Sequence, residues 1–451
     1  MKILYNLAFI IFGAFYLPYL LVTGRYRYGM KDRFGFLPEK VKSICAKQKI
    51  IWVHAVSVGE MKAAGILAPL LRKAFPSHRL VFSTVTHTGN KVARTIAAEQ
   101  EGVFYLPFDI SFITDRVVKT VKPKIFISME TEFWPNLMDS LYKSGPRLVL
   151  ANGRISNRSY PRYRKARFFI SRLLEKFSLI LMQSDKDAER IIALGAPKER
   201  VSVTGNLKFD IPLIDSGAKR IELRKKMNIN ENEVLIAAGS THRGEEEILA
   251  DCFSNLKKDY PGLRLLIAPR HIERVEEIER FLSKTGFKSI RVSHLFTNHA
   301  PYENLRFRTG HELRTMTEGN LERSRGTNDE QSIFLLDTIG ELKSMYSAAD
   351  IVFVGGSLVK KGGQNPIEPA SMMKPIIFGK YTFNFHDAVK IFLENDAGVE
   401  VDDKKGLYSA LKLFLDDPGY RDRLGRNAKG AIIKNSGSSQ KTINLILSNS
   451  L

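Results

Sequence analysis

Residues 49–75, KIIWVHAVSVGEMKAAGILAPLLRKAF, combine a short apolar strand, a turn at Gly59 and a run typical of a helix. Ser57-x-x-Glu60 ahead of the apolar run matches a helix capping box, in which the two side chains satisfy unpaired backbone N–H groups. Glu60 also follows the carboxyl end of the strand, where it is placed to act as a catalytic base. A helix N-terminus lowers the pKa of a carboxylate, so a base here needs burial to restore its basicity. The spacing alone favours the cap and leaves the base open.

Further apolar runs of strand length follow, and most are separated by stretches long enough for a helix. This alternation predicts an α/β protein whose parallel sheets are covered by helices on both faces. The polar segment 214–233 divides the runs into two series, which predicts two Rossmann-like domains. Ligands of such sheets bind outside the carboxyl ends of the strands, so the cleft between the domains is the expected site. The expected strands are 50–54, 79–84, 124–128, 147–151, 179–183, 234–239, 264–269, 333–337, 351–356 and 375–379.

The predicted organisation has five parts. Within the second domain, residues 294–331 are polar and aperiodic, which predicts a mobile insertion. The five parts are a membrane anchor (1–30), an N-terminal Rossmann-like domain (31–213), a linker (214–233), a C-terminal Rossmann-like domain (234–430) and a C-terminal helix (431–451).

The N-terminal segment 3–24 contains no charged side chain, and a run of this length can cross a bilayer about 30 Å thick. Positive charge directly after it predicts that the downstream chain stays in the cytoplasm. A helix that is buried, or that lies along the membrane surface, is the alternative. The two cysteines are far apart and lack metal-ligand spacing, so the main body is expected to be reduced and cytosolic. The charged residues after the segment are Arg25, Arg27, Lys31 and Arg33.

The chain has 69 Lys and Arg residues against 48 Asp and Glu, a net charge of +21 at pH 7. This excess indicates an anionic partner, either nucleic acid, anionic lipid or a phosphorylated substrate. Between Arg154 and Lys176 eight basic residues and one acidic residue are interleaved with aromatics. Together with the anchor, this stretch favours a lipid surface, with a solvated helix as the alternative. The aromatics are Tyr160, Tyr163, Phe168 and Phe169.

Three further strand ends or turns carry polar side chains suited to chemistry. Glu130 and Glu132 lie two apart in SMETEFWPN (128–136), and neighbouring buried carboxylates raise each other's pKa, as acid–base pairs need. Lys208 in TGNLKFD and Arg270 in LIAPRH are suited to a phosphate. The alternatives are a solvated strand exit, a solvated lysine and a surface ion pair.

The stretch 354–379 has four glycines in nine residues, followed by Asn365-Pro366-Ile367-Glu368 at the expected start of a helix. Glycines let the backbone approach a ligand, and a helix N-terminus offers N–H groups to a phosphate. Glu368 is suited to a ribose diol. The stretch is neither a Walker loop nor G-x-G-x-x-G, and a nucleotide site is favoured over a plain turn. The chain has no HExxH, CxxC pair or G-x-S-x-G, so no metal site or serine nucleophile is predicted.

Taken together, these motifs resemble those of the bacterial Kdo transferases, which attach 3-deoxy-D-manno-oct-2-ulosonic acid (Kdo) to the lipid A precursor. The similarity spans nearly the whole chain, including the N-terminal segment. The segment 294–331 is longer than the family's usual loop, and we expect it to change partner contacts rather than chemistry. The matching motifs are HAVSVGE, METEFWPN, ANGRISNRS, TGNLKFDI, GSTHRGEEE, APRHIER, DTIGEL, GGSLVKKGGQNPIEPA and TFNFHD.

The resemblance implies a GT-B glycosyltransferase fold, with two Rossmann-like domains around a cleft and an N-terminal anchor helix. It implies inverting, metal-independent transfer of Kdo from CMP-Kdo to lipid IVA, without a cofactor, in lipopolysaccharide core synthesis. The implied partners are CMP-Kdo, the lipid A precursor and the anionic inner membrane at its cytoplasmic face, and not nucleic acid.

The resemblance also implies roles for particular residues. Glu60 becomes the general base, and Glu130 and Lys208 become stabilisers of the transition state. The alternatives are a nucleotide-sugar epimerase of GT-B architecture and a non-catalytic basic scaffold, and the anchor and the glycine-rich stretch argue against them. The implied CMP contacts are Pro269, Arg270, Ile339, Gly340, Glu341, Asn365, Pro366, Ile367 and Glu368.

Overall fold

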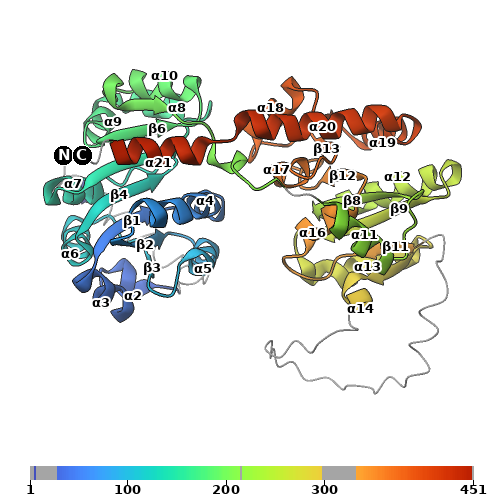
Figure 1. The fold of residues 1–451 in the computed structure, drawn as a ribbon, viewed down its shortest axis with the longest axis horizontal. Coiled ribbons are helices and arrows are strands. Elements are labelled where there is room, and N and C mark those ends of the chain that lie inside the picture. Colours follow the sequence, from blue (N-terminus) through green and yellow to red (C-terminus); the bar gives the residue numbers. More distant parts are fainter. Residues whose placement is uncertain (1–4, 7–27, 214–215, 297–331, 449–451) are drawn as a thin grey trace, which may run out of the picture. The chain divides into compact units, whose positions relative to one another are not determined.

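The structure, a computed structural model, divides into two compact units (Figure 1). The first comprises Met1–Ile211 with Asn435–Leu451, and the second comprises Pro212–Lys434. Most of the predicted anchor and of the predicted insertion lies outside the described residues. Among the helices in the described part of the chain, none is both long and apolar enough to cross a membrane. The described residues are 5–6, 28–213, 216–296 and 332–448.

The first unit contains a seven-stranded parallel sheet with the order β3-β2-β1-β4-β5-β6-β7. The chain winds outward in one direction from β1 and in the other from β4. In doubly wound sheets, ligands bind at such a switch point, outside the carboxyl ends of the strands. The strands are β1 (Lys49–His54), β2 (His78–Thr84), β3 (Gly102–Tyr105), β4 (Pro123–Met129), β5 (Arg147–Gly153), β6 (Leu179–Met182) and β7 (Val201–Val203).

Helices cover both faces of this sheet, so its strands are apolar on both sides (Figure 1). In β1, Trp52 belongs to one buried cluster with Phe126, while Ile51 and Val53 belong to the cluster on the other face. The helices and 3-10 turns are α2 (Met30–Arg33), α3 (Glu39–Lys47), α4 (Val58–Ala74), α5 (His87–Ile96), α6 (Ser111–Val121), α7 (Pro135–Ser144), α8 (Tyr160–Lys165), α9 (Arg167–Leu174), α10 (Asp185–Ala193), η1 (Lys198–Arg200) and η2 (Leu207–Phe209).

The second unit contains another seven-stranded parallel sheet, with the order β10-β11-β9-β8-β12-β13-β14. Its switch point lies between β8 and β12. The strands are β8 (Val234–Thr241), β9 (Leu263–Pro269), β10 (Lys288–Arg291), β11 (Ser332–Leu335), β12 (Ile351–Val354), β13 (Ile376–Gly379) and β14 (Val399–Val401). The helices and the 3-10 turn are α11 (Gly217–Lys226), α12 (Glu245–Asp259), η3 (Ile272–Arg274), α13 (Val275–Lys284), α14 (Val292–Phe296), α16 (Leu342–Ala348), α17 (Ile367–Ala370), α18 (His386–Glu394), α19 (Lys404–Asp416) and α20 (Pro418–Asn435).

The predicted α/β plan with two parallel sheets is confirmed, and each of the expected strands overlaps a strand of the structure. Four strands were not expected from the sequence: β3, β7, β10 and β14. They are the outermost strands of the two sheets, and each has three or four residues.

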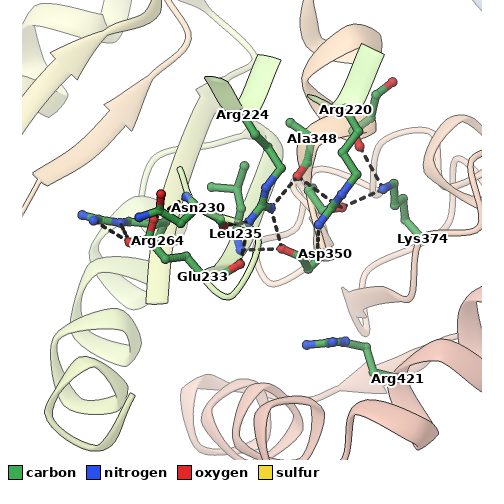
Figure 2. Close-up of polar contacts among 12 residues, drawn as sticks. Arg220, Arg224, Asn230, Glu233, Leu235, Arg264, Ala348, Asp350, Lys374 and Arg421 are labelled. Carbon is green, nitrogen blue, oxygen red and sulfur yellow. Dashed lines mark hydrogen bonds and ion pairs between the residues drawn. The ribbon is translucent and has the colours of Figure 1, made fainter. Parts of the chain in front are cut away.

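The segment 214–233, predicted as a linker, contains helix α11, which is fastened to the second unit. Figure 2 shows Arg220 and Arg224 pointing from α11 towards Asp350, just before β12. The carboxylate of Asp350 accepts hydrogen bonds from Arg220 at 2.7 Å and from Arg224 at 3.0 Å. It also accepts one from the backbone N–H of Leu235 at 2.8 Å. One carboxylate, 14% exposed, therefore ties α11 to two strands of the sheet.

Arg224 is 1% exposed, and the two terminal nitrogens of its guanidinium donate to further acceptors inside the second unit. Nearby, the buried ammonium of Lys374 donates to the carbonyls of Ser347 and Ala349. Burial, with the Arg220 guanidinium nearby, lowers the pKa of Lys374 to about 8. This network fixes the amino-terminal side of the sheet, opposite the edge where ligands bind (Figure 2). The further acceptors of Arg224 are the carbonyls of Asn230, Glu233 and Ala348.

The C-terminal segment 431–451, predicted as one helix, contains the end of α20 and a separate helix, α21 (Ser438–Ser448). Gly437, with a φ of 92°, stands at the break, in the left-handed conformation common just after a helix. Helix α21 belongs to the first unit, where Ile443 and Ile446 share a buried cluster with Leu207. In Figure 1 it is the red helix drawn with the blue and green elements.

Candidate functional site

Glu60 lies at the carboxyl end of β1, in the first turn of α4, and it is a cap. The N-cap residue Ser57 accepts a hydrogen bond from the backbone N–H of Glu60 at 3.4 Å. The Glu60 carboxylate accepts one from the Val56 N–H at 2.7 Å and one from the Ser57 hydroxyl at 2.8 Å. The capping prediction is confirmed, with the glutamate reaching back to Val56 rather than to Ser57 N–H.

The same carboxylate is only 8% exposed, and its pKa is raised. Burial is the largest cause, followed by the charge of Glu130. Hydrogen bonds from Val56 and Ser57 and the charge of Lys208 act in the opposite direction, without cancelling the rise. The effect of burial on the pKa of Glu60 is therefore larger than the opposite effect of the helix N-terminus. Glu60 combines a capping role with the basicity that a proton acceptor needs.

Glu130 directly follows β4, the strand next to β1. Its φ of 54° is left-handed, a conformation that costs a non-glycine residue roughly 1–2 kcal/mol. Its N–H donates to the carbonyl of Ala151 on β5 at 2.9 Å, and its carboxylate pairs with the Lys208 ammonium at 3.0 Å. Both side chains are about one fifth exposed, at 22% and 23%. The strained backbone and the partly exposed ion pair place two opposite charges beside Glu60.

A third carboxyl group, that of Glu132, belongs to the same cluster. Burial, followed by the charges of Glu60 and Glu130, raises the pKa of Glu132 to about 8. The sequence indicates Glu130 and Glu132 as a candidate acid–base pair, and the resemblance implies a catalytic role for Glu130. The structure adds that burial, more than the two neighbouring charges, makes the carboxyl group of Glu132 the harder one to ionise.

His54, the last residue of β1, is fully buried beneath this cluster. Its Nδ1 lies 2.9 Å from the Ser83 hydroxyl, and its ring lies edge-on to Trp134 with 6.4 Å between centroids. Burial lowers the pKa of His54 to about 4, so the imidazole is neutral at physiological pH. His54 therefore supports the floor of the site rather than contributing a charge to it.

In the second unit, Glu245 organises the glycine-rich turn, which comprises residues 355–363. Glu245 opens α12, is fully buried, and its carboxylate accepts hydrogen bonds from Gly356 at 2.6 Å and from Ser357 and Leu358 at 3.0 Å. Burial raises the pKa of Glu245, and these amides oppose the rise. These three N–H groups are therefore bonded to a carboxylate of the protein, and the expected approach of a ligand to the glycine backbone stays a prediction.

A cationic group lies at the carboxyl ends of β8 and β9. Pro269 is the buried last residue of β9, and the exposed Arg270 donates its N–H to the carbonyl of Thr241 at 2.9 Å. Burial lowers the pKa of His242, and the neighbouring His271, Lys361 and Arg270 charges lower it further. The sequence identified Arg270, whereas His242 and Lys361 lie within matching motifs without having been assigned a role.

The turn after β11 lies at the same edge of the sheet. Ile339 is 82% exposed, and Gly340 has a φ of 96°, which a side chain would disfavour. Glu341 is the N-cap residue of α16 and accepts a hydrogen bond from the Thr338 hydroxyl. Because β11, β9, β8 and β12 are neighbours in the sheet, this turn, Arg270 and the glycine-rich turn gather along one edge.

The segment Asn365–Glu368 leads into a single helical turn, α17 (Ile367–Ala370), so a helix does begin here as expected. The amide of Asn365 accepts from the N–H of Ile367 at 3.1 Å and donates to the Glu368 carboxylate at 3.0 Å. Pro366 has no N–H, and Ile367 is buried. The N–H of Ile367 is therefore bonded within the protein, and the nucleotide contacts expected of Asn365 through Glu368 stay predictions.

The basic and aromatic stretch 154–176 forms α8 and α9 of the first unit. Tyr160, Tyr163 and Phe169 pack against the core, whereas Phe168 is 67% exposed under the Arg172 guanidinium. A pocket of about 190 Å³ lies beside α9. The surface is thus one exposed aromatic ring surrounded by basic side chains rather than an aromatic face. The pocket is lined by Tyr5, Pro135, Asn136, Asp139, Phe169, Arg172, Leu173 and Lys176.

Comparison with known proteins gives one consistent family. A sequence profile described as 3-deoxy-D-manno-octulosonic-acid transferase (kdotransferase) matches residues 28–211. The 3-deoxy-D-manno-octulosonic acid transferase of Haemophilus influenzae is 35% identical over 423 residues, 94% of this chain and 91% of that protein. That of Aquifex aeolicus is 30% identical, over 84% of this chain and 89% of that protein.

Similarity to solved structures concerns the fold. The UDP-GlcNAc 2-epimerase of Neisseria meningitidis matches with a TM-score of 0.56 at 13% identity, over 89% of this chain and all of that one. A glycosyltransferase of Rickettsia africae matches with a TM-score of 0.54, also at 13% identity, over 89% of this chain and 99% of that one. At such low identity, the same architecture serves both transferases and epimerases, so the fold does not choose between them.

Proposed function

The chain belongs to the 3-deoxy-D-manno-octulosonic acid (Kdo) transferase family and is a glycosyltransferase, and from this premise we propose that it transfers Kdo from CMP-Kdo to the lipid A precursor lipid IVA. In the proposed step an acceptor hydroxyl attacks C2 of Kdo from the face opposite the phosphate. The new C2–O bond forms as the bond to CMP breaks, CMP leaves with the bonding pair, and Glu60 takes the hydroxyl proton. The anomeric centre is inverted without a metal ion.

The observation that carries this proposal is the buried carboxylate of Glu60 at the carboxyl end of β1. A general base works best when its pKa lies near the working pH and its position is fixed. Burial raises the pKa of Glu60, and hydrogen bonds from Val56 and Ser57 fix its carboxylate. A surface glutamate would have neither property.

The ion pair of Glu130 and Lys208 supplies the other charges that the reaction needs. Breaking the bond from C2 to the phosphate builds positive charge on the sugar ring and negative charge on the departing CMP. A carboxylate stabilises the first and an ammonium the second, provided both are already oriented. The 3.0 Å ion pair orients the two groups before the substrates bind.

The donor nucleotide is proposed to bind at the switch point of the second sheet, between β8 and β12. Arg270 and Lys361, which both lie near His242, offer positive charge to the single phosphate of the donor. Glu368 is proposed to accept hydrogen bonds from the ribose diol, beside the exposed turn at Ile339 and Gly340. Glu245 holds the glycine-rich turn in one conformation before the donor binds. Binding then does not cost the free energy of ordering this turn.

The acceptor is proposed to reach the enzyme at the cytoplasmic face of the inner membrane. The uncharged segment 3–24 supplies an anchor, and the basic side chains of α8 and α9 attract anionic lipid headgroups. Phe168 supplies an apolar contact at the centre of this surface.

The direct test is mass spectrometry of the lipid after the purified protein is incubated with CMP-Kdo and lipid IVA. We expect the lipid mass to increase by one or more Kdo units as CMP is released, and the spectrum also counts these units. Consumption of the donor without any change in the lipid would favour an epimerase or a hydrolase instead. Absence of any turnover would favour the scaffold.

Replacing Lys208 by methionine is expected to lower kcat about 100-fold, with little change in KM for CMP-Kdo. The substitution keeps the length of the side chain and removes the charge that opposes the negative charge on CMP. Steady-state release of CMP measures both constants. Lys42→Met is the matched control, since Lys42 also pairs with a glutamate, at 3.1 Å, but both partners are exposed. Equal activity of the two variants would exclude Lys208 from the reaction.

Replacing Arg270 by alanine is expected to weaken CMP binding about tenfold, the usual contribution of one hydrogen bond to a charged group. Isothermal titration with CMP measures the change. Arg243→Ala is the control. Arg243 lies just after β8, the strand next to β9, but its side chain is 73% exposed and pairs with Glu277. If the control weakens CMP binding equally, the effect is only a loss of net charge.

A further inference from the structure

The carboxylate of Asp210 connects the turn that carries Lys208 to the far end of the chain. Asp210 directly follows η2 and is two residues from Lys208. Its Oδ1 accepts hydrogen bonds from the N–H groups of Gly437 at 2.7 Å and Ser438 at 3.2 Å, and its Oδ2 accepts one from Ser439. These N–H groups begin α21, where a helix N-terminus favours a carboxylate. The contact joins residues 227 positions apart in the sequence.

Close packing accompanies these hydrogen bonds. Gly205 has a φ of 95°, and a Cβ atom at this position would lie 2.4 Å from the Ser438 hydroxyl oxygen. Ser438 is itself buried, and Leu207 of η2 shares a core cluster with Ile443 and Ile446 of α21. The turn and the helix therefore form one packed element rather than touching at a single polar contact.

Strand β5 holds both parts of this element. At its amino end, Arg147 donates to the Ile446 carbonyl at the end of α21, at 2.7 Å. At its carboxyl end, the buried Asn152 accepts from the N–H of Leu207 at 3.0 Å. Between them, the carbonyl of Ala151 accepts from the N–H of Glu130. One strand thus holds the backbone of Glu130 through Ala151 and that of Leu207, the residue before Lys208, through Asn152.

We propose that Asp210 is a positioning residue, which uses the N-terminus of α21 to hold η2 so that the Lys208 ammonium meets the Glu130 carboxylate. A single 3-10 turn has few internal hydrogen bonds and does not fix a long lysine side chain by itself. The inference rests on the proposed function, because it assigns to α21 the orientation of a group that acts on the reaction.

Replacing Asp210 by alanine is expected to lower kcat about tenfold or more, because misplacement by about 1 Å is costly for a catalytic group. KM for CMP-Kdo is expected to stay within about twofold, since Lys208 acts mainly in the transition state. Asp210→Asn keeps one acceptor oxygen and should fall between alanine and the unchanged protein. Asp403→Ala is the control, because Asp403 also caps a helix, α19, through one hydrogen bond of 2.9 Å from Gly406.

A double substitution separates positioning from general loss of structure. If Asp210 acts through Lys208, Asp210→Ala lowers kcat in the native background and has no further effect in the Lys208→Met background. An equal fall of kcat in both backgrounds, or an unchanged kcat for Asp210→Ala alone, overturns the proposal. Normal kcat of Lys208→Met would instead overturn the role of Lys208 in the proposed function, which is a different result.

Hydrogen exchange gives a second readout that does not depend on turnover. In Asp210→Ala, faster exchange is expected both at the start of α21 and at the Leu207 and Lys208 amides, while α10 stays unchanged. Faster exchange of α21 with an unchanged η2 would show that the turn is held without Asp210, and would overturn the proposal.

Discussion

Replacing Glu60 by glutamine is expected to lower kcat for Kdo transfer about 10³-fold, which is within the range for loss of a general base. Glutamine keeps both local contacts: its oxygen accepts from the Val56 N–H, and its amide donates to the Ser57 hydroxyl. The melting temperature and the affinity for CMP should therefore stay close to those of the unchanged protein. The comparison uses kcat from CMP release, calorimetric titration with CMP, and thermal unfolding.

The pH dependence of the same variant gives an independent check. The base must be ionised, so kcat falls as the pH drops through the pKa of Glu60, which burial raises above the ordinary value. The folded protein binds this proton more tightly than the unfolded chain, so the carboxyl group stabilises the fold at low pH. That contribution is lost as the pH rises from the ordinary pKa to the raised one. Glu60→Gln should lose this acid limb of the profile and this pH-dependent loss of stability.

Ser57→Ala is the complementary variant. It removes the cap and keeps the carboxylate, so it is expected to lower the free energy of unfolding by about 1 kcal/mol. Because it also removes a hydrogen bond to the ionised carboxylate, the acid limb of kcat should move to higher pH. If Glu60→Gln instead keeps its turnover and loses several degrees of melting temperature, Glu60 is a cap alone.

Replacing Arg224 by alanine is expected to lower the free energy of unfolding of the second unit by about 3–5 kcal/mol. The guanidinium is 1% exposed and donates to Asp350 and to three backbone carbonyls. Its removal leaves these acceptors buried without one of their donors. Urea unfolding followed by circular dichroism measures the change as a lower midpoint.

Lys219→Ala on the same helix is the control for this measurement. Lys219 pairs with Glu222 at 2.9 Å, and both side chains are 44% exposed, so its loss should leave the midpoint nearly unchanged. If the two variants unfold at the same midpoint, α11 does not contribute to the stability of the second unit.

The strands that sequence reasoning found and missed differ in a physical way. Inner strands such as β1 and β12 are covered on both faces, so they are continuous apolar runs that stand out in the sequence. The edge strands pair on one side and are short, as β7 (VSV) and β14 (VEV) show. A strand of three residues is too short to show a pattern of apolar residues, and its conformation depends on pairing with the neighbouring strand.

The first site could be predicted in part. Glu60 and Glu130 follow recognisable inner strands, so the sheet order explains why they are neighbours. The pairing of Lys208 with Glu130, and the burial that raises the pKa of Glu132, depend on the long-range fold, which no local pattern contains. The balance between burial and the helix terminus at Glu60 likewise depends on the surrounding structure.

In the second unit the sequence was less informative, because the same patterns serve structure and binding. Glu245 stands in an ordinary acidic helix start, GEEE, and nothing in that pattern predicts that it binds Gly356, Ser357 and Leu358. The backbone N–H groups of a glycine-rich turn can be bonded to a carboxylate of the protein itself instead of to a ligand. Only the long-range fold distinguishes that turn from one open to a phosphate.

The return of α21 to the first unit has a consequence for how the protein is made. Ile443 and Ile446 complete a buried cluster whose other members lie mostly before residue 210. During synthesis, domains usually fold in order from the N-terminus. Here the first unit lacks part of its core until α21 has been translated. Translation of the entire second unit therefore precedes completion of the first, and a chain that stops before α21 leaves this cluster without Ile443 and Ile446.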